Sequence, residues 1–247
     1  MKLDKHYTEP RLVELYDIEN PHDIDTDFYI QLAHDLKAKV IVDLGCGTGL
    51  LTRQLATKER TVIGVDPAMA MLAYARRQPG AEKVEWIEGY SAALGERDAD
   101  LAVMTSNVAQ VFLDDANWAK TLRDICRTLK VGGHLAFESR NPADKGWERW
   151  TPETTFQRIE SPSGGVVESW LEVVEVGNGW VRFRGHNFFV EGGETAVVDS
   201  TLRFRSHAEI VDSLHEAGFV VEEVFGDWEK RPFTPESRMM IFIARRQ

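Results

Sequence analysis

Between residues 39 and 138 the chain alternates short apolar runs with amphipathic stretches, and this alternation constrains the fold more than any other feature. The apolar runs are rich in β-branched residues and end at turn residues, as strands do. They lie at 39–45, 61–66, 83–89, 100–105 and 134–139. The alternation predicts an α/β doubly wound fold, in which a parallel sheet is covered by helices on both faces.

The stretches between these runs carry helix signals. Leu51 and Leu55 lie one helical turn apart, and Asp66-Pro67 supplies the N-cap and first residue of the next expected helix. A further helix is expected after Asp114 and Asp115. Its apolar face consists of Trp118, Leu122, Ile125 and Leu129.

After Asn141-Pro142 the pattern changes. Residues 151–205 contain no convincing helix and predict antiparallel strands, with turns at "SPSGG", "VGNGW" and "EGGE". Ser206 and Glu209 then form a capping box, which opens a helix that ends at Gly218. Two final strands follow at 219–225 and 238–246.

The chain is therefore expected to have three parts. These are a helical N-terminal lid segment at 1–38, an α/β core at 39–142 and 206–247, and an antiparallel β insertion at 143–205. The insertion follows the fifth strand and is expected to serve as an acceptor, lid or dimer subdomain. The edges of its sheet are unpaired and could join a second copy of the chain in a homodimer.

Charge and composition narrow the function classes. The formal net charge is −11, with 40 acidic against 29 basic residues, which disfavours nucleic acid as a partner. No apolar run approaches the length of a membrane span, and the polar N-terminus is not a secretory signal. Cys46 and Cys126 form neither a disulfide framework nor a metal-type spacing. We therefore expect a cytoplasmic protein without a membrane partner.

The glycine-rich stretch "VDLGCGTG" at 42–49 follows the first expected strand. A dinucleotide fold requires G-x-G-x-x-G, but Leu50 stands at the position of the third glycine. A phosphate-binding P-loop is excluded, because no Gly-Lys-Ser/Thr follows. The spacing is instead acid-x-G-x-G-x-G, beginning at Asp43.

This pattern resembles the first motif of class I S-adenosylmethionine-dependent methyltransferases, and the resemblance covers most of 39–138 and resumes at 206–246. It implies a seven-stranded, mostly parallel, Rossmann-like sheet. It also implies S-adenosylmethionine as cofactor and S-adenosylhomocysteine as product. In that family a bare glycine backbone passes close to the cofactor, where a Cβ would obstruct it. Asp43 is then expected near the α-amino group, and Asp66 at the ribose hydroxyls.

The resemblance also implies contacts at the ends of the third and fourth strands. Tyr90 stands where the family often has an acid for the adenine amino group, so Ser91, backbone amides or the Tyr90 ring would serve. Thr105–Asn107 is expected beside the methionine portion, with a polar strand end as the alternative. The expected cofactor residues are Asp43, Gly45, Cys46, Gly47, Thr48, Gly49, Asp66, Pro67, Met71, Tyr90, Ser91, Ala92, Thr105, Ser106 and Asn107.

Acceptor residues are expected in the N-terminal segment and after the fifth strand. Tyr7 and Tyr16 are lid candidates, because an aromatic face can lie against a sulfonium cation; simple packing is the alternative. Arg140 and Asn141 fall at the cofactor end of the sheet, with Trp147 entering the insertion. Arg140 is suited to grip an anionic acceptor such as a carboxylate, with a surface salt bridge as the alternative.

His186 is the histidine to test first as a general base. It shares one strand face with Trp180, Arg182 and Arg184, so a solvated sheet face is the alternative. The Asp114-Asp115 pair could suggest Mg²⁺, but an N-cap explains it more simply, and no metal is expected.

Together these features predict S-adenosylmethionine-dependent methyl transfer to N or O of a small-molecule acceptor by in-line displacement. The layout is similar to the small-molecule N-/O-methyltransferase branch. One alternative is an RNA or protein methyltransferase, although "TSNVA" at 105–109 lacks the Asn-Pro-Pro-Tyr type motif of amino-directed nucleic-acid enzymes. The other is an S-adenosylmethionine-binding protein without catalysis.

Overall fold

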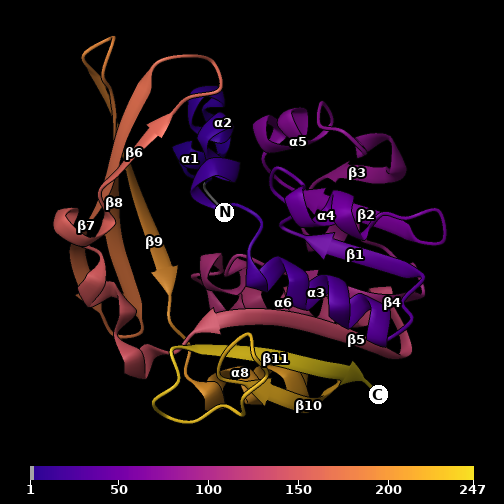
Figure 1. Ribbon diagram of the computed structural model, residues 1–247. Coiled ribbons are helices and arrows are strands. Elements are labelled where there is room, and N and C mark those ends of the chain that lie inside the picture. The colour runs from indigo at the N-terminus through magenta and orange to yellow at the C-terminus, as the bar shows by residue number, and fades with distance from the viewer. Residues whose placement is uncertain (1–2) are drawn as a thin grey trace.

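The computed structural model describes residues 3–247 and contains two separate sheets (Figure 1). The larger has seven strands in the order β10-β11-β5-β4-β1-β2-β3. Strands β1 to β5 run parallel, and β11 lies antiparallel between β5 and β10. Their bounds are β1 Val40–Leu44, β2 Thr61–Asp66, β3 Val84–Glu88, β4 Ala99–Met104, β5 Leu129–Arg140, β10 Phe219–Phe225 and β11 Met239–Arg246.

Helices cover both faces of this sheet. Helices α3 (Ile24–Asp35) and α4 (Leu50–Leu55) pack on one face, and α6 (Asp115–Thr128) and α8 (His207–Glu216) pack on the other. Successive strand residues alternate between the two cores. The central strands β1, β2 and β4 are therefore mostly apolar, as expected of a sheet buried on both faces.

The insertion forms the second sheet, whose four strands are all antiparallel. Its strands are β6 Gln157–Glu160, β7 Val166–Gly177, β8 Trp180–Phe189 and β9 Glu194–Arg203. Helices α1 (Lys5–Thr8) and α2 (Pro10–Glu19) lie between this sheet and the core (Figure 1). Leu12 and Leu15 of α2 pack on the insertion, while Val13 packs against Ala68 and Met71 of the core.

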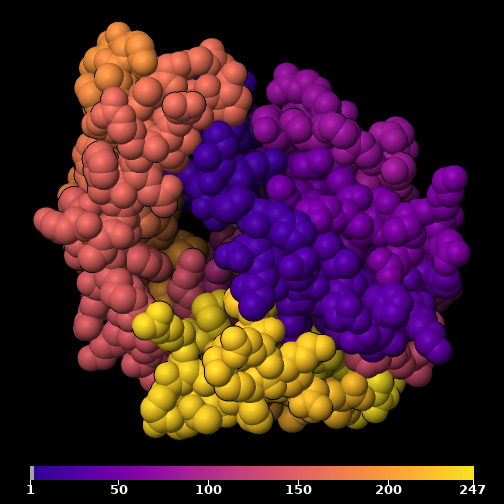
Figure 2. Space-filling view, in the orientation of Figure 1, coloured from indigo at the N-terminus to yellow at the C-terminus, as the bar shows by residue number. Residues whose placement is uncertain are grey.

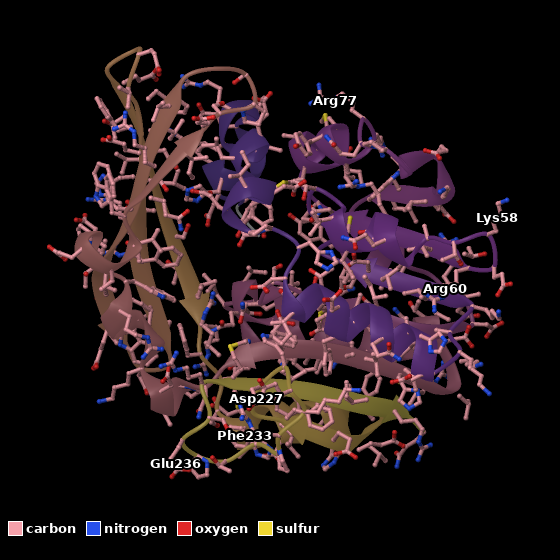
Figure 3. All side chains as sticks on the ribbon, viewed as in Figure 1. Lys58, Arg60, Arg77, Asp227, Phe233 and Glu236 are labelled. Atoms are coloured by element: carbon pink, nitrogen blue, oxygen red, sulfur yellow. The ribbon has the colours of Figure 1, made fainter. Side chains whose placement is uncertain are left out.

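The remaining elements are short. They are α5 Met69–Ala75, η1 Ala81–Lys83, η2 Ser91–Ala93, η3 Val108–Val111, η4 Pro142–Asp144, η5 Gly146–Arg149 and α7 Pro152–Thr155. The loop after β10 carries Phe233, whose ring stacks on His207 with 5.0 Å between centroids. Figure 3 shows Asp227, Phe233 and Glu236 of this loop at the edge formed by β10 and β11, far from Arg77.

The predicted fold class is confirmed, and three local predictions are wrong. Helix α5 begins at Met69, because Asp66 and Pro67 remain in the preceding turn and the Asp66 side chain accepts from the backbone N–H of Ala68. Strand β5 begins at Leu129, so the "VGG" stretch belongs to the strand. The short helix α7 interrupts the region expected to contain only strands.

No helix within residues 3–247 is both long enough and apolar enough to cross a membrane.

Candidate functional site

The neighbouring strands β1 and β4 form the topological switch point of the main sheet, because the chain order reverses between them. In open α/β sheets, ligands bind outside the carboxyl ends of the strands at this point. The glycine turn follows β1, and Thr105–Asn107 follows β4. Both candidate regions therefore lie at the place where the topology favours a ligand.

The glycine turn has a left-handed backbone at Gly47 (φ +53°) and Gly49 (φ +75°). A Cβ added to Gly49 would lie 2.3 Å from the Trp86 ring, so this glycine is required by packing. A Cβ added to Gly47 would meet no atom within 4 Å. The space beside Gly47 is therefore open to a ligand that approaches the backbone.

Asp66 connects this turn to the end of β2. Its carboxylate accepts the backbone N–H of Gly47 at 2.9 Å and that of Ala68 at 2.8 Å. Burial raises the pKa of Asp66, while these two hydrogen bonds oppose the rise. A carboxylate offers about four lone-pair positions, so two remain for hydroxyl donors of a ligand.

Asp43 is 1% exposed and has one oxygen without a partner. Its Oδ2 accepts the Thr52 hydroxyl at 2.6 Å, whereas Oδ1 is buried without a hydrogen bond. Burial raises the pKa of Asp43 to about 7, the negative charge of Asp66 adds to the rise, and the Thr52 hydrogen bond opposes it. A buried, unpaired carboxylate oxygen is suited to an ammonium donor. These features fit S-adenosylmethionine. Asp43 suits its amino group, Asp66 suits its ribose hydroxyls, and the open space beside Gly47 leaves room for the cofactor to approach the backbone.

A second left-handed turn follows β4, at Ser106 (φ +55°) and Asn107 (φ +61°). Glu138 of β5 holds this turn, because its carboxylate accepts the backbone N–H of Asn107 and the hydroxyl of Tyr29. Burial raises the pKa of Glu138 to about 7, and these two hydrogen bonds oppose the rise. The Asn107 side-chain oxygen Oδ1 is buried without a partner, so it is available to a ligand donor.

Two adjacent residues of α2 contact the two turns. The hydroxyl of Tyr16 is hydrogen-bonded to Ser106, and Asp17 accepts the hydroxyl of Thr48. Burial raises the pKa of Tyr16 to about 12. The Tyr7 ring lies edge-on to Tyr16, with 6.3 Å between centroids. The N-terminal helices therefore cover the switch point, where the lid was expected.

The residues expected to select the acceptor at the end of β5 have different surroundings. Arg140 is close enough to Tyr7 and Tyr16 to interact with them electrostatically. Asn141 instead fixes a loop, since its Nδ2 donates to the carbonyls of Pro235 (2.9 Å) and Ser237 (2.7 Å). Trp147 packs edge-on to Phe204, at 4.7 Å between centroids.

Several other expected cofactor residues have structural partners. The Ser91 hydroxyl donates to Asp124 of α6 at 2.7 Å, and Met71 is buried against the N-terminal helices. Tyr90 is 44% exposed, and Ala92 is also exposed. Cys46 and Pro67 are partly buried beside Gly47 and Asp66. Asp114 caps α6 by accepting the backbone N–H of Asn117, as the simpler reading of the Asp114-Asp115 pair predicted.

His186 lies on the face of the insertion sheet that points away from α1 and α2. The neighbouring residues Gly185 and Asn187 contact His6 of α1, and side chains alternate between the faces of a strand. The His186 ring stacks on Trp170, at 4.9 Å between centroids, and its Nε2 lies 3.4 Å from the Glu172 carboxylate. None of the contacts described here joins His186 to the two turns.

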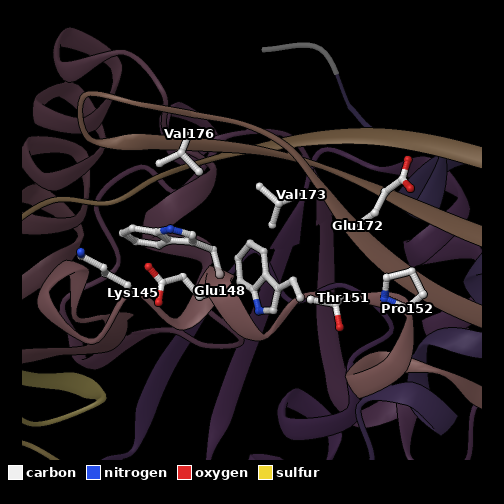
Figure 4. Close-up of a pocket in the computed structure, with 9 residues that line it drawn as sticks. Lys145, Glu148, Thr151, Pro152, Glu172, Val173 and Val176 are labelled. Carbon is white, nitrogen blue, oxygen red and sulfur yellow. The ribbon is translucent and has the colours of Figure 1, made fainter.

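Figure 2 shows a hollow where the insertion, the N-terminal segment and the core meet. A separate groove of about 610 Å³ lies between the chain that precedes α7 and the edge of β7 (Figure 4). Its lining includes Trp147, Trp150, Val173 and Val176, and no residue of either turn. We therefore place the candidate site at the switch point and not in this groove.

The sequence interpretation missed Glu138, Asp17 and Gln110 as parts of the site. Glu138 had a usable signal, because this charged residue directly follows the apolar residues 135–137 inside an expected buried strand, and buried charged side chains normally have a partner or a function. Asp17 and Gln110 carried no such signal, since their contacts come from segments distant in the sequence.

The family profile described as "Methyltransferase domain" matches residues 41–133. Cypemycin N-terminal methyltransferase from a Streptomyces species is 25% identical over 219 residues, which cover 86% of this chain and 85% of that protein. Demethylmenaquinone methyltransferase of Thermus thermophilus is 34% identical over 56% of this chain and 64% of its own length.

Solved structures show the same fold over nearly the whole chain. The CcbJ methyltransferase of Streptomyces caelestis matches with a TM-score of 0.76 at 22% identity, covering 97% of this chain and 98% of that one. CalS10, an amino pentose methyltransferase from Micromonospora echinaspora solved with S-adenosylmethionine bound, matches with a TM-score of 0.69 at 21% identity. That match covers 95% of this chain and 96% of CalS10.

We expect alanine substitution to lower the thermal stability by different amounts at Gly47 and Gly49. Gly49→Ala combines a left-handed backbone with overlap on Trp86, and we expect it to lower Tm by more than about 6 °C. Gly47→Ala carries only the backbone strain, about 1–2 kcal/mol, and we expect a decrease of about 2–6 °C. Thermal unfolding of both variants without cofactor checks this, and equal decreases would contradict the packing role of Gly49.

Because of Glu138, we expect the free energy of unfolding to depend on pH. The folded carboxyl keeps its proton up to about pH 7, whereas an unfolded Glu loses it near pH 4, so the folded state loses stability as the pH rises between these values. From pH 5.5 to 8 we expect the parent to lose about 2 kcal/mol more than Glu138→Gln, which keeps the shape of the side chain. Urea unfolding without cofactor measures this difference. Parallel pH profiles would mean that Glu138 is ionised throughout.

Proposed function

Because the chain is a class I S-adenosylmethionine-dependent methyltransferase, we propose that it transfers the methyl group to a nitrogen or oxygen of a small-molecule acceptor. The observation that carries the cofactor assignment is Asp43, whose buried free oxygen lies in the strand that leads into the open glycine turn. The enclosure of the switch point by α1, α2 and the insertion supports a small acceptor.

The proposed roles follow from the site geometry. When bound, the cofactor supplies an electrophilic methyl group on a positively charged sulfur. Asp43 holds the amino group, Asp66 the ribose hydroxyls, and Ser106 and Asn107 the methionine side. Tyr7 and Tyr16 exclude water and present aromatic rings to the cationic end.

Transfer is an in-line displacement, in which a lone pair of the acceptor forms the new bond to carbon while the carbon–sulfur bond breaks. The enzyme therefore acts mainly by positioning, and a base is required only when the acceptor arrives protonated. We assign acceptor selection to the lid segment at 1–38, of which residues 3–38 are described, and to the insertion at 143–205. A homodimer through the insertion stays a prediction.

A second candidate is methylation of a peptide amino terminus. It is favoured by one observation, the similarity over 86% of the chain to a relative named for N-terminal methylation of cypemycin. A short peptide and a small amine would both need access through the hollow in Figure 2. Transfer of labelled methyl groups to matched pools of small amines and short peptides separates the two.

Asp66→Ala is expected to weaken S-adenosylmethionine binding by about 100-fold. The change removes two charge-assisted hydrogen bonds to the ribose and the support of the Gly47 N–H. Isothermal titration calorimetry measures the Kd, and Asp212→Ala on the exposed side of α8 is the control. An unchanged affinity in Asp66→Ala would exclude the ribose role.

His186→Ala is expected to leave kcat/KM within about twofold of the parent value at every pH tested, because His186 faces away from the lid helices. The measurement uses the acceptor found in the labelled pools. Loss of activity with a changed pH profile would restore the assignment of His186 as general base.

A further inference from the structure

Arg140 is a partly buried cation that forms no ion pair with a carboxylate in the described residues. Its Nη1 donates to Gln110 Oε1 at 2.9 Å, and its guanidinium carbon lies 5.4 Å from the centroid of the Trp150 ring. Within the described residues 3–247, no Asp or Glu oxygen lies within 4.0 Å of its nitrogens. An unpaired buried charge costs several kcal/mol, so proteins normally pair it.

Arg205 shows how this chain treats a buried arginine that has a structural role. It is 4% exposed, and its Nη2 contacts Asp115 at 2.8 Å. Its Nη1 donates to the carbonyl of Ala109, and its Nη2 also donates to the carbonyl of Phe112. Arg205 is therefore neutralised and saturated by the protein, and Arg140 is not.

The groups around Arg140 do not neutralise it. Tyr7 and Tyr16 have pKa values raised by burial and are uncharged at neutral pH. Glu138, two residues away on β5, attracts Arg140 electrostatically but forms no ion pair with it, and its two oxygens accept hydrogen bonds from Tyr29 and Asn107.

Gln110 gives Arg140 a fixed orientation. The Gln110 side chain is fully buried, and its Nε2 donates to the carbonyl of Arg203 at 3.3 Å. Its Oε1 is thereby directed toward Nη1 of Arg140. The other N–H donors of the guanidinium group are available to a planar acceptor. The two oxygens of a carboxylate match the spacing of two such parallel donors.

We propose that Arg140 binds a carboxylate of the acceptor, so that the acceptor is a small organic acid anchored at the end of β5. This inference rests on the proposed function and specifies its substrate class. A singly charged carboxylate suits the site better than a doubly charged phosphate, because a single guanidinium group is available there to balance the charge.

The first test identifies the chemistry of the acceptor. A small-molecule extract of the source cells is incubated with the enzyme and methyl-labelled S-adenosylmethionine in three forms: untreated, with carboxylates converted to methylamides, and phosphatase-treated. We expect label transfer in the untreated and phosphatase-treated extracts and loss of transfer after amidation. Full transfer to the amidated extract, or loss only after phosphatase treatment, would overturn the proposal while leaving methyl transfer intact.

The second test concerns Arg140 itself. With the acceptor purified from the extract, we expect Arg140→Lys to lower kcat/KM by about 100-fold without changing the Kd for S-adenosylmethionine. Arg182→Gln, on the outer face of the insertion, is the matched control and should retain full activity. An Arg140→Lys variant with normal kcat/KM would overturn the proposal.

A third measurement does not depend on knowing the acceptor. If Arg140 is kept for a ligand, Arg140→Met removes an unpaired charge and leaves only Gln110 Oε1 without its donor, so Tm should fall by less than about 3 °C. Arg205→Met leaves Asp115 and two carbonyls without their donor, and its Tm should fall by more than about 5 °C. A decrease for Arg140→Met as large as that for Arg205→Met would make Arg140 structural. Failure of the parent to bind S-adenosylmethionine by calorimetry would instead refute the proposed function, so the two failures can be distinguished.

Discussion

The hydrogen bond between the Gly47 N–H and the Asp66 carboxylate is the interaction on which the rest of the site depends. It fixes the turn after β1 to the end of β2, and it leaves the Gly47 backbone open on its other side. The turn after β4 is built in the same way, because Glu138 of the neighbouring strand β5 accepts the N–H of Asn107. Each left-handed turn at the switch point is thus held by a buried carboxylate from an adjacent strand.

This arrangement explains how helix α2 is positioned on the core. Tyr16 and Asp17 are consecutive residues of α2, yet one bonds to the turn after β4 and the other to the turn after β1. The helix can make both contacts only when the two turns are correctly spaced. The position of α2 and the spacing of the two turns are therefore coupled through adjacent residues of one helix.

The sequence predicted the sheet well, because apolar runs and turn residues define strands that are buried on both faces. The predicted bounds of the strand at 219–225 agree with β10. The start of α5 was misplaced, since Asp66 and Pro67 serve the turn and not the helix. The alternation of Arg182, Arg184 and His186 was correctly identified, but alternation alone does not say which face meets the lid. Contacts such as Gln110 with Arg140 join segments that only the folded chain brings together.

The charges of the site are separated along the sheet edge. Asp43 and Asp66 lie at the ends of β1 and β2, and Arg140 lies at the end of β5. A cofactor that carries a sulfonium and an acceptor that carries a carboxylate would therefore be drawn to different ends of one enclosed site. Burial strengthens both attractions, because the effective dielectric constant there is low. The polarity of the site would then contribute to the positioning that in-line transfer requires.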